Sequence, residues 1–129
     1  MGFLDFLKRK YVSEKQFTYN LQRQMLIYPK VLSELRNLGI NEHAVMKLYF
    51  FFYTNKRSKA EQLKEKLSEK AYAVEEVRKS LSNNKWMVCG LSVPIKMDVN
   101  ELSAWSKYMC EAGYTYDCFF DCWDIERDN

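Results

Sequence analysis

The hydrophobic positions in the first third of the chain recur at helical spacing. They follow one another in steps of three and four residues, as positions on one face of an α-helix do. These positions are Phe17, Leu21, Met25, Tyr28, Leu32 and Leu35. The pattern runs to Leu38, and Gly39 is a typical stop signal. Because Pro29 lacks a backbone N–H, the pattern predicts a leading helix that is kinked at Pro29 or split there into two consecutive helices.

The rest of the chain alternates between strand-like and helix-like segments. Runs of β-branched and aromatic residues predict strands over 45–53, 71–80, 86–93 and 115–125. Between them, an apolar stripe behind a capping pair predicts two helices, which begin at Ser58 with Glu61 and at Asp98 with Glu101 and end near Lys70 and Gly113. After the leading helix the order is β-α-β-β-α-β. This order predicts an α+β, ferredoxin-like antiparallel sheet with both crossover helices on one face.

Strand alternation divides the side chains of this sheet between two faces. The face predicted to lie beneath the crossover helices carries Met46, Leu48, Phe50, Phe52, Met87, Cys89, Leu91, Val93, Tyr116, Cys118, Phe120 and Cys122. The opposite face is predicted to carry Val45, Lys47, Tyr49, Phe51, Tyr53, Trp86, Val88, Asp117, Phe119, Asp121 and Trp123. That second face is therefore aromatic and acidic. The leading helix is expected to cover it in part and to leave a partner surface at its rim.

Composition and charge add to this picture. Aromatic residues make up 16% of the 129-residue chain, and its formal net charge is +3. The charge is unevenly distributed, because residues 1–70 carry 14 basic and 7 acidic side chains, whereas residues 71–129 carry 6 and 10. A net charge this small does not by itself indicate nucleic-acid binding. The acidic end coincides with the last predicted strand and its aromatic residues.

The N-terminus and the cysteines bear on location and chemistry. No run approaches the roughly 20 apolar residues that span a bilayer, and a basic cluster that follows apolar residues is in the wrong order for a secretory signal. Residues 1–13 are interpreted as an arm that caps the domain, with a membrane-surface arm as the alternative, and 14–129 as a single domain. The four cysteines form no C-x-x-C pair, and His43 is the sole imidazole. We predict a cytoplasmic protein with reduced thiols and neither metal nor cofactor.

Enzymatic and RNA-binding interpretations lack the residues that they need. A hydrolase needs a nucleophile and a base that meet, yet His43 lies in a predicted loop beside Glu42. The four glycines are too widely separated for a phosphate-binding loop. An aromatic sheet face suggests RNA stacking, but Asp117 and Asp121 would repel phosphate, and the strand KWMVCGLSV lacks the pattern of the main RNA-contacting motif. The basic segment 56–70 has interleaved glutamates, as solvated helix surfaces do.

The acidic and aromatic residues of the second face instead suit the capture of a basic protein. Aromatic side chains anchor interfaces, and carboxylates steer a positively charged partner toward them. The candidate partner-binding residues are Tyr49, Phe51, Trp86, Tyr116, Asp117, Phe119, Asp121 and Trp123. The sequence thus predicts a non-enzymatic protein-binding module, with no prediction of its oligomeric state.

Three segments resemble the RraB family, the regulators of ribonuclease E activity B. They are the aromatic strand LYFFFY before a capped helix, the strand WMVCGLSV before a proline and a capped helix, and the turn and strand over 113–119. In that family the last segment is similar to YDGW. Here Tyr116 and Asp117 match its core, while Cys118 and Phe119 stand in place of Gly and Trp.

The resemblance covers approximately residues 21–126. It implies a ferredoxin-like protein without catalytic activity that binds a partner protein, in the archetype a ribonuclease that it inhibits. The archetype is strongly acidic, whereas this chain has a net charge of +3, which favours a partner other than ribonuclease E itself. Two alternatives stay open: an immunity protein that neutralises a cognate bacterial toxin, and a small RNA-binding module.

Overall fold

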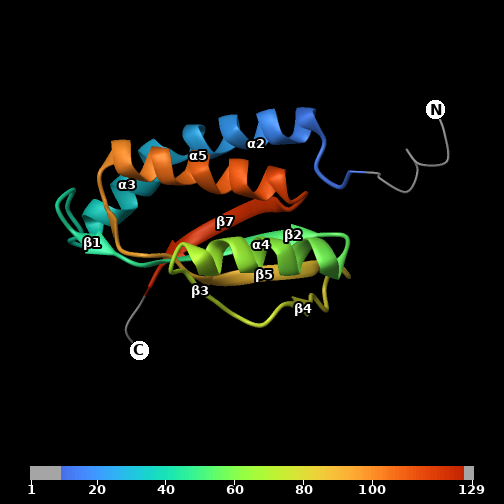
Figure 1. The fold of residues 1–129 in the computed structure, drawn as a ribbon. Helices are drawn as coiled ribbons and strands as arrows, with labels where there is room; N and C mark the ends of the chain where they lie inside the picture. The colour runs from blue at the N-terminus through green and yellow to red at the C-terminus, as the bar shows by residue number, and fades with distance from the viewer. Residues whose placement is uncertain (1–9, 127–129) are drawn as a thin grey trace.

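Helices lie against one face of an antiparallel sheet (Figure 1). The computed structural model describes residues 10–126, so most of the predicted arm at 1–13, and residues 127–129, lie outside the described residues. In chain order, the elements are α2 (Glu14–Leu26), α3 (Tyr28–Asn37), β1 (Val45–Met46), β2 (Leu48–Thr54), α4 (Arg57–Glu69), β3 (Ala73–Val74), β4 (Arg78–Lys79), β5 (Trp86–Leu91), β6 (Ile95–Lys96), α5 (Val99–Thr115) and β7 (Phe119–Ile125). The predicted α+β class is confirmed.

The main sheet has the strand order β3-β5-β2-β7, and β4 also pairs with β5. Every pair is antiparallel. Its larger elements follow the order that the sequence predicts, with α4 after β2 and α5 before β7. The predicted strand at 45–53 divides at Lys47, because β1 pairs with β6 in a separate two-stranded sheet. The predicted strand at 71–80 is two short strands, β3 and β4.

The leading helical pattern forms two helices, α2 and α3. Ile27 separates them, and Pro29 lies in the first turn of α3, where its missing N–H is not needed. This confirms the split into two consecutive helices. Ser13 caps α2: its hydroxyl accepts a hydrogen bond from the Gln16 amide (3.1 Å), and the Gln16 side chain accepts one from the Ser13 amide (2.9 Å). Gly39 has a φ of +82°, which favours glycine and ends the helical segment.

The sequence predicts the start of one crossover helix correctly and the start of the other wrongly. Asp98 caps α5 by accepting a hydrogen bond from the Glu101 amide (2.8 Å), as predicted. The capping prediction for Ser58 is wrong, because α4 begins one residue earlier without a side-chain cap. Helix α5 also continues past Gly113. A Cβ at Gly113 would lie 2.6 Å from the Cys118 carbonyl oxygen. This glycine therefore allows α5 to approach the start of β7 closely.

The hydrophobic core lies between the helices and the inner face of the sheet, the side that packs against α4 and α5. On β2, Leu48, Phe50 and Phe52 are fully buried. The two helices contribute Ala60, Leu63, Leu67, Leu102, Trp105 and Met109. The rings of Trp105 and Phe120 pack edge to face with their centres 5.9 Å apart. Burial of this apolar surface is the main stabilising term of the fold.

The predicted faces of β5 are reversed. Val88 pairs with Phe52 and Trp86 pairs with Thr54, so both lie on the inner face. Val88 is fully buried. The residues of β5 that alternate to the other face are Met87, Cys89 and Leu91. Every residue of this strand is apolar or glycine, so its alternation carries no information on which face is buried.

A β-bulge interrupts the pairing of β7 with β2. Phe51 pairs with Cys122 and Phe52 pairs with Phe120, which leaves Asp121 as the extra residue. Before the bulge, the alternation is as predicted, and Phe120 is buried on the inner face. One extra residue shifts the alternation by one position and exchanges the two faces of the strand beyond it.

Beyond the bulge, Trp123 and Ile125 lie opposite buried residues of β2, on the inner face. The Trp123 ring packs against the Trp105 ring with their centres 6.0 Å apart. Cys122 is exposed on the opposite face. The predictions that Trp123 points away from the helices and that Cys122 points toward them are therefore wrong.

Candidate functional site

The face of the sheet that points away from α4 and α5 carries aromatic and other apolar side chains. They come from three neighbouring strands, and we call these seven residues the open face: Tyr49, Phe51, Tyr53, Met87, Leu91, Phe119 and Cys122. Cys89 pairs with Phe51 on the same side but is only 4% exposed, so it is not counted among them. All seven lie outside the hydrophobic core of the described chain. Phe51 occupies a central place, because it lies on the middle strand with β5 and β7 on either side.

Helix α2 lies beside α5 and along the edge of β7 (Figure 1). The ring of Phe17 stacks on Tyr114 at 4.5 Å, and Asn20 and Arg23 donate hydrogen bonds of 2.7 Å to backbone carbonyls of β7. The helix approaches the open face at its rim, where the Arg23 guanidinium lies 5.7 Å from the Phe119 ring centre. The leading helix was expected to cover part of this face. It reaches the face only at this rim, because its apolar side chains pack on α5.

Two carboxylates lie along the β7 side of the open face. Asp121 occupies the bulge, and Asp124 pairs with Tyr49 in the register. Burial raises the pKa of the Tyr53 hydroxyl, and the negative charge of Asp121 raises it further. Asp121 is therefore within electrostatic reach of the open face. This side of the sheet combines aromatic side chains with negative charge.

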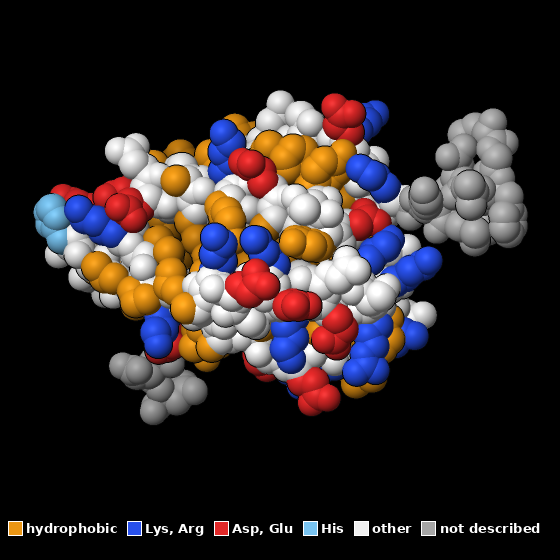
Figure 2. Space-filling model, in the orientation of Figure 1, with side chains coloured by type: hydrophobic (Ala, Val, Ile, Leu, Met, Phe, Trp, Pro, Cys, Tyr) orange, Lys and Arg blue, Asp and Glu red, His pale blue; other side chains and the backbone are white. Residues whose placement is uncertain are grey.

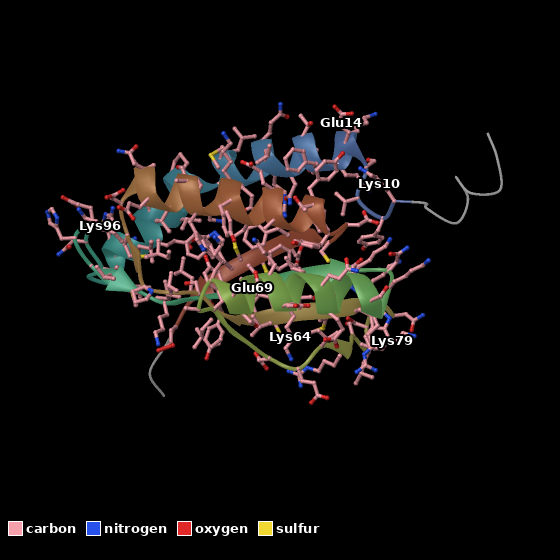
Figure 3. The ribbon with its side chains drawn as sticks, in the orientation of Figure 1. Lys10, Glu14, Lys64, Glu69, Lys79 and Lys96 are labelled. Atoms are coloured by element: carbon pink, nitrogen blue, oxygen red, sulfur yellow. The ribbon has the colours of Figure 1, made fainter. Side chains whose placement is uncertain are left out.

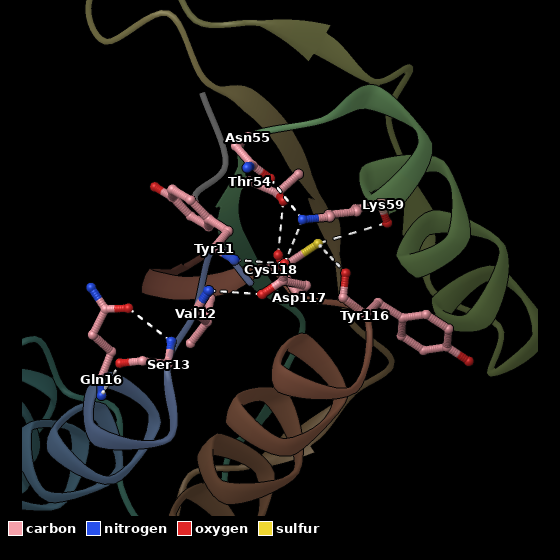
Figure 4. A network of polar contacts seen from close by, with 10 residues as sticks. All are labelled: Tyr11, Val12, Ser13, Gln16, Thr54, Asn55, Lys59, Tyr116, Asp117 and Cys118. Carbon is pink, nitrogen blue, oxygen red and sulfur yellow. Dashed lines mark hydrogen bonds and ion pairs between the residues drawn. The ribbon is translucent and has the colours of Figure 1, made fainter. Parts of the chain in front are cut away.

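Asp117 occupies the turn between α5 and β7 and is held by several contacts (Figure 4). Its carboxylate accepts hydrogen bonds from the backbone amides of Tyr11 and Val12, both at 2.7 Å, and forms an ion pair with Lys59 at 2.5 Å. The Thr54 hydroxyl donates to its backbone carbonyl at 2.8 Å. Its φ of +59° is left-handed, a conformation that Asp tolerates better than most residues.

These contacts give Asp117 a structural role. Burial raises its pKa, but the hydrogen bonds from Lys59 and from the Val12 and Tyr11 amides outweigh burial, so the pKa is lowered overall. The side chain is 16% exposed, and both carboxylate oxygens accept hydrogen bonds within the protein. Asp117 therefore ties the N-terminal segment and α4 to the start of β7. The neighbouring Tyr116 packs against the core.

Two tryptophans of the predicted partner surface lie on the inner face. Trp86 is near the start of α4, and its ring centre lies 5.5 Å from the Arg57 guanidinium and 5.7 Å from the Lys79 ammonium. Trp123 packs against Trp105. Of the eight predicted residues, the structure brings together Tyr49, Phe51, Phe119 and Asp121, and it places Trp86, Tyr116, Asp117 and Trp123 elsewhere.

The candidate site predicted from sequence omits Tyr53, Met87, Leu91 and Cys122, and Cys122 was predicted to point toward the helices. Alternation along β2 places Tyr53 on this face, so the sequence pattern alone could have added Tyr53 to the predicted site. Met87 and Leu91 carry no comparable signal, because both sides of β5 are apolar. Their register opposite β2 assigns them to the open face.

The outer surface of α4 carries mixed charge. Basic and acidic side chains are interspersed over this helix (Figure 2), and Lys64 and Glu69 are two of them (Figure 3). Arg57 forms an ion pair with Glu61 one helical turn away, at 3.5 Å. The interspersed charges agree with the solvated helix surface predicted for residues 56–70.

The cysteine thiols of the described chain have raised pKa values. The four cysteines are free, and burial raises the pKa of Cys110 and Cys118 to about 12 and that of Cys122 to about 11. Such thiols are protonated near neutral pH and are weak nucleophiles and ligands. Within residues 10–126, no three His, Cys, Asp or Glu side chains are grouped so as to hold a metal ion.

The length and polarity of the helices decide whether one of them could cross a bilayer. Across residues 10–126, none of them combines the length and the apolar character that crossing a bilayer requires.

The fold and the open face define an α+β protein that carries exposed and half-buried aromatic side chains on the sheet face opposite α4 and α5. The family described as regulator of ribonuclease activity B, RraB, matches residues 29–125, about three quarters of the chain. The chain belongs to this family of ribonuclease regulators, which confirms the resemblance seen in the sequence. The matched segment begins after α2 and contains every strand of the main sheet. A comparison with curated proteins gives no match.

Proposed function

We propose that this protein binds a ribonuclease through the open face and inhibits it, without catalysing a reaction itself. The family match over residues 29–125 carries the proposal, because it contains all three strands that form the open face. Four free cysteines suit the reducing environment of the cytoplasm, where we place its action.

The chemistry of the open face supports a protein partner. Phe51 lies between Tyr49 and Tyr53 along β2, and aromatic side chains already held by a sheet lose little freedom on binding. Asp121 and Asp124 add negative charge at one side. An enzyme that cleaves RNA binds phosphates with basic side chains. Acidic groups beside aromatic anchors complement such a surface and would compete with RNA for it.

An inhibition assay tests this proposal. The cleavage rate of RNA is measured for purified endoribonucleases of the source organism, ribonuclease E among them, with rising amounts of wild-type protein, Phe51→Asp or Leu81→Asp. Leu81 is fully exposed in the turn before β5, so it serves as the control. We expect wild type and Leu81→Asp to inhibit one enzyme equally, and Phe51→Asp to require at least about tenfold more protein, as loss of a hot spot does.

Each other outcome contradicts a defined part of the proposal. If none of the enzymes is slowed, the protein is not a ribonuclease inhibitor, and an immunity protein specific for a toxin would give that result. If Phe51→Asp inhibits as well as Leu81→Asp while remaining folded by circular dichroism, the open face is not the binding surface. Direct binding to RNA alone that persists at moderate salt would favour the RNA-binding alternative.

A further inference from the structure

A groove runs between the free edge of β7, which points away from β2, and the helices α2 and α3. It encloses about 170 Å³, and its walls come from the junction of α2 and α3, from α3 itself, and from residues 121–125 of β7. The apolar side chains on the helical wall are Ile27, Val31, Leu35 and Leu38. We call this feature the β7 groove. Ile27 and Leu38 are 39% and 56% exposed, so the groove is open to solvent at that wall.

The strand that borders the groove is an edge strand with unpaired backbone groups. In the described sheet, β7 pairs with β2 on one side and is last in the strand order. The Glu126 amide donates to the Lys47 carbonyl (3.1 Å). Because backbone groups alternate along a strand, the N–H and C=O groups of Asp124 and Cys122 also point toward β2. Trp123 and Ile125 therefore direct theirs toward the groove. The Ile125 amide is bonded to the Asp124 carboxylate at 2.8 Å, which leaves the Trp123 amide and carbonyl facing the groove.

The other half of this edge is covered by α2. Asn20 donates to the Phe120 carbonyl and Arg23 donates to the Asp121 carbonyl, both at 2.7 Å. These side-chain hydrogen bonds satisfy the carbonyls of residues 120 and 121, as the backbone of a neighbouring strand otherwise would. No described side chain does the same at Trp123, so the accessible edge is confined to the part that faces α3.

A buried polar atom lies in the groove wall without a partner. Gln24 is 1% exposed, and its Oε1 accepts no hydrogen bond in the described structure. Its amide nitrogen makes two long contacts of 3.5 Å, to the Asn20 side chain and to the Asp121 carbonyl. An unpaired buried acceptor is unfavourable. Because Gln24 belongs to the groove lining, a small turn of its side chain would bring Oε1 to a backbone amide of a segment lying in the groove.

The charge around the groove is negative. Among the described residues, three acidic side chains line it, Glu34, Asp121 and Asp124, together with one basic side chain, Arg23. The Arg23 guanidinium is already engaged by the Asn20 side chain and by two backbone carbonyls of β7. The groove therefore complements a segment that carries basic side chains.

We propose that the β7 groove receives an extended segment of the partner protein, which adds to the free edge of β7 as an antiparallel or parallel strand. The segment bonds the Trp123 backbone, places an apolar side chain against Ile27 and Val31, and sets a Lys or Arg side chain among Glu34, Asp121 and Asp124. Strand addition of this kind draws affinity from main-chain hydrogen bonds and specificity from alternate side chains. This inference rests on the proposed function and names a second contact site for the same partner.

Two variants of neighbouring residues test the contribution of the groove to binding independently of the open face. Ile27→Arg places bulk and positive charge in the groove, and Leu26→Arg puts the same side chain at the neighbouring position, which is 79% exposed and outside the groove. Affinity for the ribonuclease that the inhibition assay identifies is measured by calorimetry. We expect Ile27→Arg to weaken binding at least tenfold and Leu26→Arg to leave it within twofold of wild type.

Hydrogen exchange on the wild-type chain gives a second measurement that does not depend on a variant folding. Exchange over residues 122–126 is compared in the free protein and in the complex, and we expect the Trp123 amide to become protected. Unchanged exchange at Trp123, together with equal affinities of folded Ile27→Arg and Leu26→Arg, overturns the groove inference and leaves the proposed function intact. Failure of wild type to bind any ribonuclease removes the proposed function, and the groove inference with it.

Discussion

The two faces of the sheet have similar side chains and opposite surroundings. Along β2, Leu48, Phe50 and Phe52 are fully buried against α4 and α5. The residues between them point to the open face, where Tyr49 remains 37% exposed. Aromatic rings on the inner face pack against other aromatic rings, as Trp105 does with Phe120. The same residue type therefore contributes to folding on one face, and we infer that it contributes to binding on the other.

The largest contrast is expected between Phe50→Ala and Phe51→Ala. Loss of the fully buried Phe50 ring leaves a cavity and should lower the free energy of unfolding by about 3–5 kcal/mol. Phe51 is half-buried on the open face, so its loss should lower it by about 1 kcal/mol. Urea denaturation of both variants measures the difference. Equal losses of stability would mean that the two faces are equally packed.

A second pair sharpens the comparison on β7. Trp123 packs on Trp105, whereas Phe119 lies before the bulge on the open face. Trp123→Ala should lower the free energy of unfolding by about 2–4 kcal/mol, and Phe119→Ala by about 1 kcal/mol. Thermal and urea unfolding report both values. The reverse ranking would contradict the bulge at Asp121.

A third prediction concerns Asp117, which ties the N-terminal segment and α4 to the start of β7. Its pKa is lowered in the folded protein, so its contribution is fully present above the unfolded pKa and is lost as pH falls through the folded pKa. Asp117→Asn should lower the free energy of unfolding at pH 7 by about 1–3 kcal/mol. The difference from wild type should shrink below about pH 4.

Urea unfolding of wild type and Asp117→Asn from pH 7 to pH 3 checks this dependence. Glu111→Gln is the control, because Glu111 is exposed on α5. If the stability difference between wild type and Asp117→Asn does not change with pH, the negative charge of Asp117 is not what stabilises the fold.

The smallest effect involves the cysteines and leaves stability unchanged. Cys122 is exposed on the open face, whereas Cys89, Cys110 and Cys118 are buried. Because its pKa is raised to about 11, alkylation of Cys122 should be slow at pH 7 and should accelerate about tenfold per pH unit up to that value. Mass spectrometry identifies the alkylated residue. Equal labelling of Cys110 in the folded protein would contradict the burial of Cys110 on α5 and the exposure of Cys122 on β7.

The predictable parts of the fold depend on local signals. Pro29 marks the division between α2 and α3, Asp98 caps α5, and alternating burial along β2 follows its sequence pattern. The misplaced residues lie where such signals are missing. Trp86 belongs to a strand that is apolar on both sides, and Trp123 follows an extra residue that alternation cannot reveal. Two of the eight predicted site residues were misassigned for these reasons.

The order of helices and strands, the α+β class and membership of the RraB family can be predicted from the chain alone, because each depends on residue types and their spacing. Which apolar side chains face solvent depends on how distant segments pack together. Pairing with β2 assigns the faces of β5, the bulge at Asp121 exchanges the faces of β7, and contacts with Tyr11, Val12 and Lys59 make Asp117 an internal anchor. These outcomes depend on partners that are distant in sequence, and periodicity within one segment carries no information about them.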